Sequence, residues 1–127
     1  MDWVRTWTAA PLAPFTTIGT GGKAKLLVTV ANANAVVAVL RILRTYDVPW
    51  FCLGAGSDLL VADEGYQGVV VKLDKDFQYV EGLPAGPVTA CGPVLITVGA
   101  AAPLAGMAAM TAEAGLAGLE FACGIPG

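Results

Sequence analysis

The chain has 127 residues, a length that suits one domain with a sizeable core. Hydrophobic residues make up 56% of it and charged residues 13%, so we expect some apolar surface to pack against further chain, another subunit or a cofactor. The net charge of −3 argues against a nucleic-acid partner. Because there is no histidine, the commonest general base and transition-metal ligand is missing, and no metal site is predicted.

Cysteine usage and hydropathy predict a cytoplasmic location. Cys52, Cys91 and Cys123 are far apart, and the first two lie in apolar, strand-like runs, which predicts reduced thiols in the core. No signal peptide is visible at the start. Residues 82–112 carry no charge, but glycines and prolines interrupt them every few positions, which favours short strands and turns over a membrane helix.

The first half of the chain predicts a strand–helix–strand unit. Residues 1–14 form an irregular lead-in in this interpretation, and the domain proper occupies 15–127. Leu26–Val30 is a predicted strand, and Asn32 or Asn34 caps a helix that continues to about Tyr46. Trp50–Leu53 is the next strand, so the two strands are expected to run parallel. The predicted inner face of the helix consists of Val36, Val37, Leu40 and Leu43, with Arg41 and Arg44 facing water.

The second half predicts short strands and one more helix. Pro103 suits the first turn of a helix that continues through Ala114, with Gly115 as its C′ residue. The inner face of this helix is predicted to consist of Leu104, Met107, Ala108 and Thr111. The predicted strands are Val69–Leu73, Phe77–Glu81, Val88–Cys91 and Leu95–Gly99.

A glycine loop follows the strand at Trp50–Leu53 and is the main candidate site. In Gly54-Ala-Gly-Ser-Asp58, the glycines permit a tight turn that exposes successive backbone N–H groups, which suit phosphate oxygens. An ordinary β-turn is the alternative. The loop lacks the third glycine of a dinucleotide-binding fingerprint and the Gly-Lys-Ser/Thr ending of a P-loop.

Other polar residues add little catalytic chemistry. Residues 16–22, Thr-Thr-Ile-Gly-Thr-Gly-Gly, are a second ligand-facing loop or a flexible connection. Glu120 lies in an apolar run, and we expect it to cap a loop. Ser57 has no evident base, so no catalytic residue is predicted. The residues alone indicate an α/β domain with an anion-binding loop.

Three ordered motifs carry a more specific resemblance. Residues 16–22, residues 53–65 (Leu-Gly-Ala-Gly-Ser-Asp-Leu-Leu-Val-Ala-Asp-Glu-Gly) and residues 115–127 (Gly-Leu-Ala-Gly-Leu-Glu-Phe-Ala-Cys-Gly-Ile-Pro-Gly) occur in the order and spacing of one family. The chain resembles the amino-terminal, FAD-binding part of the UDP-N-acetylenolpyruvoylglucosamine reductases, the MurB family. The similarity covers about residues 12–127.

The resemblance implies an α/β (α+β) fold of the vanillyl-alcohol oxidase/p-cresol methylhydroxylase type, with two small subdomains that hold FAD between them. The family is an NADPH-dependent oxidoreductase that reduces the enolpyruvyl ether of UDP-N-acetylglucosamine to UDP-N-acetylmuramate, a peptidoglycan precursor needed for cell wall biogenesis, cell shape and division. Carried onto this sequence, the family's cofactor-binding positions are Thr17, Ile18, Gly19, Leu53, Gly54, Ala55, Gly56, Ser57, Asp58, Leu59, Gly99, Ala100, Gly118, Gly124, Ile125 and Gly127.

Two departures from the family pattern matter. The family has asparagine where this chain has Asp58, and a carboxylate near a pyrophosphate costs about 1–2 kcal/mol at a partly solvated site. The family's substrate-binding arginine, proton-donating serine and late glutamate fall beyond the position that matches Gly127. The resemblance therefore implies a truncated domain that binds FAD weakly or not at all and does not turn over substrate; its oligomeric state is left open.

Two alternatives stay open from the sequence. One is another flavoprotein of the same fold, such as a sugar or lactone oxidase, although many of these attach FAD through a histidine, which this chain lacks. The other is a nucleotide-binding or interaction module without redox chemistry. A colourless protein that binds ADP or UDP-sugars would favour this second alternative.

Overall fold

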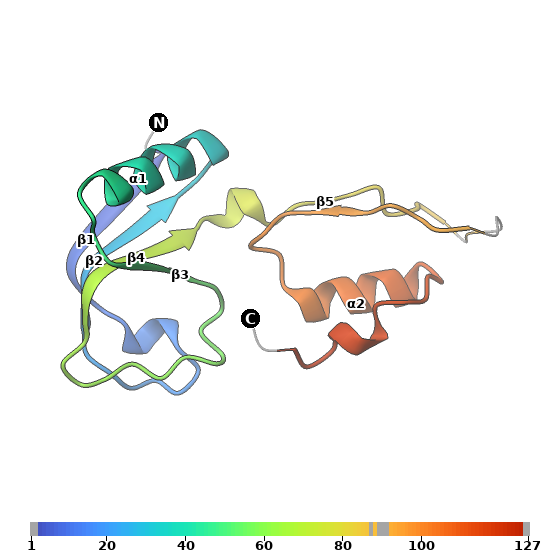
Figure 1. The fold of residues 1–127 in the computed structure, drawn as a ribbon. Helices are drawn as coiled ribbons and strands as arrows, with labels where there is room; N and C mark the ends of the chain where they lie inside the picture. Colours follow the sequence, from blue (N-terminus) through green and yellow to red (C-terminus); the bar gives the residue numbers. More distant parts are fainter. Residues whose placement is uncertain (1–2, 87, 89–91, 126–127) are drawn as a thin grey trace.

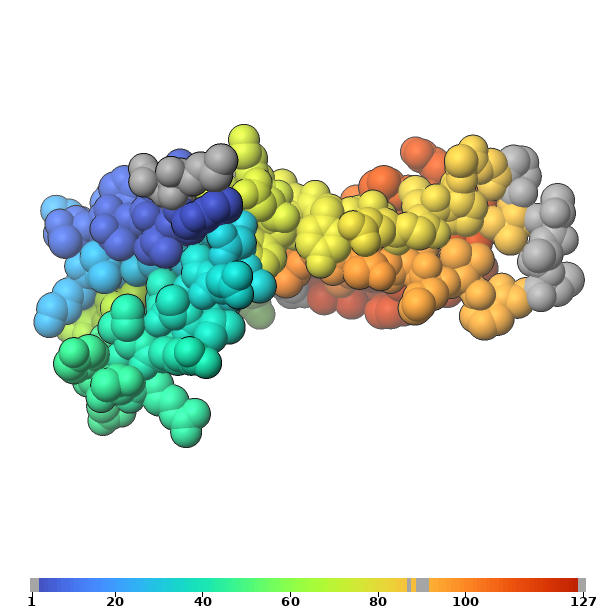
Figure 2. Space-filling model, turned by 90° about the horizontal axis from the view of Figure 1, so that it is seen from above, coloured from blue at the N-terminus to red at the C-terminus, as the bar shows by residue number. Residues whose placement is uncertain are grey.

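The computed structural model describes residues 3–86, 88 and 92–125. Figure 1 shows two lobes: a four-stranded sheet with helix α1 on one face, and a two-stranded ladder that lies beside helix α2. Seen from above in Figure 2, the first lobe (blue to green) and the second (yellow to red) lie end to end. The two predicted subdomains correspond to these lobes.

The first lobe is built on a mixed sheet of strand order β1-β2-β4-β3. Strands β2, β4 and β3 run parallel, and β1 is antiparallel to β2. The predicted parallel orientation of the strands on either side of α1 is confirmed, but β4 lies between them and pairs with both. The strands are β1 (Val4–Pro11), β2 (Lys23–Val30), β3 (Trp50–Leu53) and β4 (Tyr66–Leu73).

Helix α1 (Ala33–Thr45) begins where the sequence predicts. The side chain of Asn32 accepts a 2.9 Å hydrogen bond from the backbone N–H of Ala35, the usual role of an N-cap. The buried Ala35 and Leu43 pack against one face of the sheet, together with Val28, Val30, Val69 and Val71. The predicted exposure of Arg41 and Arg44 is confirmed.

Two expectations for the first lobe are wrong. Val37 is 46% exposed, because its position next to Val36 turns it by about 100° away from the buried stripe of the helix. The lead-in is not irregular, since Val4–Pro11 forms β1 and pairs with β2 from Val4–Val30 to Pro11–Lys23. The outer edge of β2 is therefore hydrogen-bonded to β1, which becomes the edge strand of the sheet.

The sheet face opposite α1 has its own core. Leu12, Leu27, Leu53 and Val70 are buried there, and Val61 covers them from the loop after β3. The short helix η1 (Ala13–Phe15) follows β1 and brings Phe15 onto this cluster. Two connections, residues 12–22 and 54–65, therefore close this face of the sheet.

The second lobe contains less regular structure than the sequence predicts. The expected strand at residues 77–81 is reduced to β5 (Val80–Glu81), because η2 (Lys75–Phe77) takes up its start. The expected strand at residues 95–99 is reduced to β6 (Thr97–Val98), which pairs antiparallel with β5. The strand expected at residues 88–91 falls mostly outside the described residues.

Helix α2 (Leu104–Glu113) and η3 (Glu120–Ala122) complete the lobe. Pro103 is the N-cap of α2, and Gly115 has φ +73° just past its end, as expected of a C′ glycine. Met107, Ala108 and Thr111 are buried, which confirms most of the predicted inner face, but Leu104 is 43% exposed and was wrongly assigned to it. In the described part of the chain, no helix is both long and apolar enough to cross a membrane.

Candidate functional site

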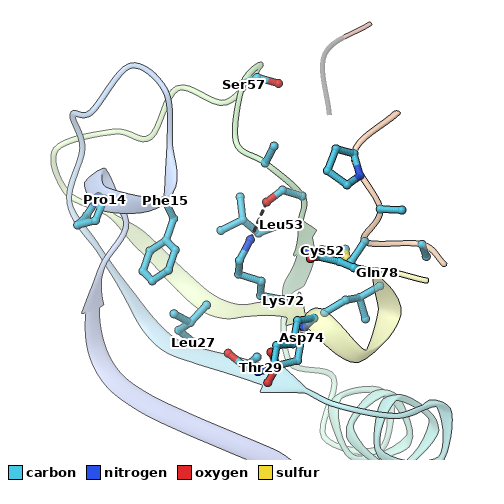
Figure 3. Close-up of a pocket in the computed structure, with 18 of the residues that line it drawn as sticks. Pro14, Phe15, Leu27, Thr29, Cys52, Leu53, Ser57, Lys72, Asp74 and Gln78 are labelled. Carbon is cyan, nitrogen blue, oxygen red and sulfur yellow. Dashed lines mark hydrogen bonds between the residues drawn. The ribbon is translucent and has the colours of Figure 1, made fainter. Parts of the chain in front are cut away.

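A cavity of about 1120 Å³ lies between the two lobes. Its wall consists mainly of apolar side chains, with a few polar groups at the strand ends (Figure 3). The first lobe contributes β1, η1, the ends of β2, β3 and β4, and the loop after β3. The second lobe contributes Ala100–Ala105, and Ile125 comes from the last described residues. A long ligand with apolar parts would be enclosed from both sides.

The polar part of the wall begins at the carboxyl ends of the parallel strands. Thr29, Lys72 and Leu53 are in register on β2, β4 and β3, and all three line the cavity. Open parallel sheets bind ligands at this edge, because the loops that leave it carry free backbone N–H groups. The glycine loop leaves the same edge directly after Leu53.

The glycine loop is tightly bent against another loop. Gly54, Ala55 and Ser57 line the cavity, whereas Gly56 is buried behind them. Gly56 has φ +69°, and a Cβ at this position would overlap the carbonyl oxygen of Phe15. Only glycine fits this bend, and its two neighbours, Ala55 and Ser57, line the cavity.

Residues 16–19 support the glycine loop from outside the cavity. The backbone N–H of Thr17 donates to the carbonyl oxygen of Gly56 at 3.0 Å, and the Thr17 hydroxyl lies 3.4 Å from the Ser57 carbonyl oxygen. The Thr16 hydroxyl accepts from the backbone N–H of Gly19 at 3.1 Å. Thr17, Ile18 and Gly19 do not line the cavity, and their contact with a cofactor stays a prediction.

Charged groups near the cavity differ in how they are paired. Lys72 Nζ donates a 2.9 Å hydrogen bond to the carbonyl oxygen of Gly54. The carboxylate of Asp74 accepts from the backbone N–H of Lys75 and forms an ion pair with Arg5 of β1. The Lys75 N–H and the Arg5 guanidinium both lower the pKa of Asp74. The charge of Asp74 is thus offset by the Arg5 guanidinium, whereas the hydrogen-bond partner of Lys72 among the described residues is an uncharged carbonyl oxygen.

Glu120 has the structural role predicted for it. Its Oε2 accepts a 2.8 Å hydrogen bond from the backbone N–H of Gly118. Its own backbone N–H and that of Gly118 lower the pKa of the carboxyl group. Loop capping by Glu120 is confirmed, and the residue does not line the cavity.

The structure brings only part of the predicted cofactor set to the cavity. The residues that line it are Leu53, Gly54, Ala55, Ser57, Ala100 and Ile125. Those that do not line it, besides Thr17–Gly19, are Gly56, Asp58, Leu59, Gly99, Gly118 and Gly124. Gly127 lies outside the described residues. Gly99 braces the second lobe, since its backbone N–H donates to the Tyr79 carbonyl oxygen at 2.8 Å.

Several residues of the cavity wall were not predicted from the sequence. Trp7–Pro11 of β1 line the cavity, although this stretch was expected to be irregular. Cys52 is an exposed free thiol on the wall, so the expectation of a core thiol is wrong. Cys91 lies outside the described residues. For Lys72, the available signal was a lone charge inside the predicted strand Val69–Leu73.

The cavity has the properties of a site for an elongated nucleotide cofactor. Its apolar walls suit flat aromatic rings, while the glycine loop and Lys72 provide a polar stretch that suits a phosphate group. The bend at Gly56, which has no room for a Cβ, is a second observation that fits a phosphate-binding turn. Within residues 3–86, 88 and 92–125, no group of three or more metal-ligating side chains is found.

A comparison with known protein families identifies the class of protein to which the chain belongs. Residues 24–127 match the model of a family described as "FAD binding domain". Because the match covers most of the sequence, the chain belongs to this FAD-binding family. The residues that line the cavity fit FAD, because the apolar walls suit its rings and the glycine loop with Lys72 suits its phosphates.

The relatives are more specific, and they confirm the resemblance to the MurB family. The chain is 41% identical over 117 residues to the UDP-N-acetylenolpyruvoylglucosamine reductase of Bacillus subtilis (strain 168), covering 92% of this chain and 36% of the relative. It is 42% identical over 118 residues to the reductase of the same name from Anaeromyxobacter sp. (strain Fw109-5), covering 93% and 34%.

A solved structure agrees with these relatives. The crystal structure of UDP-N-acetylenolpyruvylglucosamine reductase (MurB) from Thermus caldophilus matches with a TM-score of 0.67 at 33% identity, over 97% of this chain and 38% of that chain. The predicted FAD-binding fold is thereby confirmed. The chain spans about a third of the length of the curated relatives that it matches.

Proposed function

We propose that this chain binds FAD, weakly when on its own, in the cavity between its two lobes and serves as the cofactor-binding part of a UDP-N-acetylenolpyruvoylglucosamine reductase. The observation that carries the proposal is the position of the glycine loop. It leaves the carboxyl edge of the parallel strands and presents Gly54, Ala55 and Ser57 to the cavity. A pyrophosphate at this loop would place the rest of FAD along the apolar walls.

The residues of this chain would bind and orient the cofactor. Gly54, Ala55 and Ser57 would hold the pyrophosphate, and the Thr17–Gly56 hydrogen bond would keep their loop in shape. Ala100 and its neighbours at the start of α2 would exclude water from the opposite side. Bound FAD supplies the hydride chemistry of such a reductase, between NADPH and the enolpyruvyl ether of the UDP-sugar. Because both small molecules are cytoplasmic metabolites, we place the reaction in the cytoplasm.

A titration tests cofactor binding directly. FAD added to the chain should show a saturable change in flavin fluorescence. Riboflavin, which lacks the pyrophosphate and adenine, should bind at least tenfold more weakly, since each charged hydrogen bond it lacks contributes about 1.5–3 kcal/mol. Equal affinities for the two flavins would contradict the assignment of the glycine loop to the pyrophosphate. ADP binding without flavin binding would favour the nucleotide-binding module instead.

A chimera tests the reductase assignment. This chain would replace the matching 117 residues of the Bacillus subtilis relative. The chimera should retain FAD and consume NADPH only when the enolpyruvyl UDP-sugar is present. An FAD-loaded chimera that oxidises NADPH equally fast without this substrate would contradict the proposal and favour another flavoprotein of the same fold.

A further inference from the structure

Lys72 occupies an unusual position for a lysine. It lies near the carboxyl end of β4, which is an interior strand of the sheet, between β2 and β3. The preceding residue, Val71, is buried against α1 on the other face, and Lys72 is half-buried itself. Lysines are rarely buried unless their ammonium group has a partner, so the position of this side chain calls for a chemical reason.

The side chain of Lys72 is aimed at the candidate pyrophosphate loop. Its register partners are Thr29 and Leu53, and all three residues lie on the cavity wall (Figure 3). The ammonium donates one 2.9 Å hydrogen bond, to the carbonyl oxygen of Gly54. A lysine ammonium has three donors, so this contact anchors the group beside the loop and leaves donors for a ligand.

The charge of Lys72 is not balanced by a carboxylate in the described part of the chain. The carboxylate on the same wall, Asp74, forms its ion pair with Arg5. Lys75 lies close enough to Asp74 for its charge to lower the pKa of that group. Asp58, the acidic residue of the glycine loop, does not line the cavity. Both Lys72 and Lys75 line this wall, and Lys72 is the one whose ammonium is hydrogen-bonded to the glycine loop.

We propose that the Lys72 ammonium, anchored by the Gly54 carbonyl oxygen, provides the counter-charge for the pyrophosphate of FAD. The inference rests on the proposed FAD site and assigns a specific ionic contact within it. The backbone N–H groups of the loop supply hydrogen bonds, but they carry no net charge. A pyrophosphate has two negative charges, and a lysine acts on it as a point charge beside the loop.

The alternative role of Lys72 is purely structural. In that case its hydrogen bond to Gly54 only braces the loop, and its charge has no effect on ligand affinity. The two roles differ in their response to salt, since a charge–charge attraction is screened at high ionic strength whereas a bracing contact is not. They also differ in their response to the charge of the ligand.

Three variants and two ligands separate these roles. Lys72→Met keeps the aliphatic stem and removes the charge, and Lys72→Arg restores a cation. Lys25→Met is the matched control, because Lys25 is exposed and does not line the cavity. Each protein is titrated with FAD and with riboflavin at about 0.05 M and about 0.5 M salt, a range over which the screening length falls severalfold. Circular dichroism and thermal melts confirm that each variant is folded.

The proposal predicts a specific pattern. Lys72→Met should weaken FAD binding about ten- to a hundredfold, the usual effect of one charged hydrogen bond, and should leave riboflavin binding within twofold. The fall in FAD affinity with salt should be smaller in Lys72→Met than in the wild type. Lys72→Arg should recover most of the loss, and Lys25→Met should resemble the wild type.

Three outcomes would overturn the inference. One is unchanged FAD affinity in Lys72→Met while the wild type binds. Another is a loss of FAD and riboflavin affinity by the same factor with an unchanged salt dependence, which would assign Lys72 the bracing role. If the wild type itself binds no FAD, the proposed function fails, and this inference fails with it. The last outcome is distinguishable from the first two because it is seen without any variant.

Discussion

Thr17 and Gly56 are joined by a 3.0 Å hydrogen bond between the backbone N–H of the first and the carbonyl oxygen of the second. The two residues are 39 positions apart, so the bond links the loop before β2 to the loop after β3. Gly56 has φ +69° at this contact and is packed against the Phe15 carbonyl oxygen. The curvature of the glycine loop therefore depends on the second loop as well as on its own glycines.

Gly56→Ala should lower the free energy of unfolding by about 3 kcal/mol or more, because it combines an unfavourable φ with a backbone overlap. Gly115→Ala is the matched control, since Gly115 has φ +73° but open space around it, and its loss should be about 1–2 kcal/mol. Urea denaturation measures both variants. Equal losses would show that the contact with Phe15 adds nothing to the stability of the loop.

Bound FAD should protect Cys52 from alkylation. Cys52 is an exposed free thiol on the cavity wall, whereas Cys123 is an exposed free thiol that does not line the cavity. Saturating FAD should slow iodoacetamide labelling of Cys52 severalfold and leave Cys123 unchanged. Peptide mass spectrometry distinguishes the two sites. Undiminished labelling of Cys52 at saturating FAD would place the cofactor elsewhere.

Asp58→Asn should bind FAD as tightly as the wild type or up to about threefold more tightly. The Asp58 side chain is exposed and does not line the cavity, so removing its charge relieves only a screened repulsion. A fluorescence titration measures the change. Clearly weaker binding by Asp58→Asn would mean that the carboxylate contributes to the site.

The Arg5–Asp74 ion pair, which ties β1 to the end of β4, should make stability depend on pH. The pKa of Asp74 is lowered in the folded chain, so its contribution is present above the ordinary value of 3.8 and is lost as the pH falls below it toward the folded value. Because the pair is partly exposed, its contribution is about 0.2–1 kcal/mol.

Asp74→Asn should therefore lower the unfolding free energy at pH 7 and flatten its fall with acid between about pH 5 and pH 3. Denaturant melts of the wild type and the variant across this range measure the effect. The double variant with Arg5→Met isolates the pair. A variant that follows the wild-type pH profile would exclude Asp74 from this role.

Local signals in the sequence predicted much of the fold. The choice of Asn32 or Asn34 as cap placed the start of α1 to within two residues, and the apolar run before the glycines placed β3 at Trp50–Leu53. Both features depend on neighbouring residues only. The glycine loop was located for the same reason, since its glycines mark a backbone turn wherever the strand is placed.

The pairing of strands that are far apart in the sequence could not be predicted in the same way. The insertion of β4 between β2 and β3 joins residues 19 to 43 positions apart, and no local pattern specifies such a partner. The first part of β1 shows no apolar–polar alternation, since Arg5 and Thr6 are both polar, and its place on the cavity wall depends on pairing with β2. Lys72 became a candidate only when the register set it beside Leu53 and Thr29.

The central claim is that FAD lies between the two lobes, and the chemical shifts of backbone amides test it most directly. Addition of FAD to the ¹⁵N-labelled chain should shift the amide resonances of Gly54, Ala55 and Ser57 in the first lobe, together with those of Ala100, Ala101, Ala102, Leu104 and Ala105 in the second. Shifts confined to one lobe, or centred on the separate hollow near Leu95 and Leu116, would contradict the proposed site. An unchanged spectrum at millimolar FAD would contradict cofactor binding by this chain.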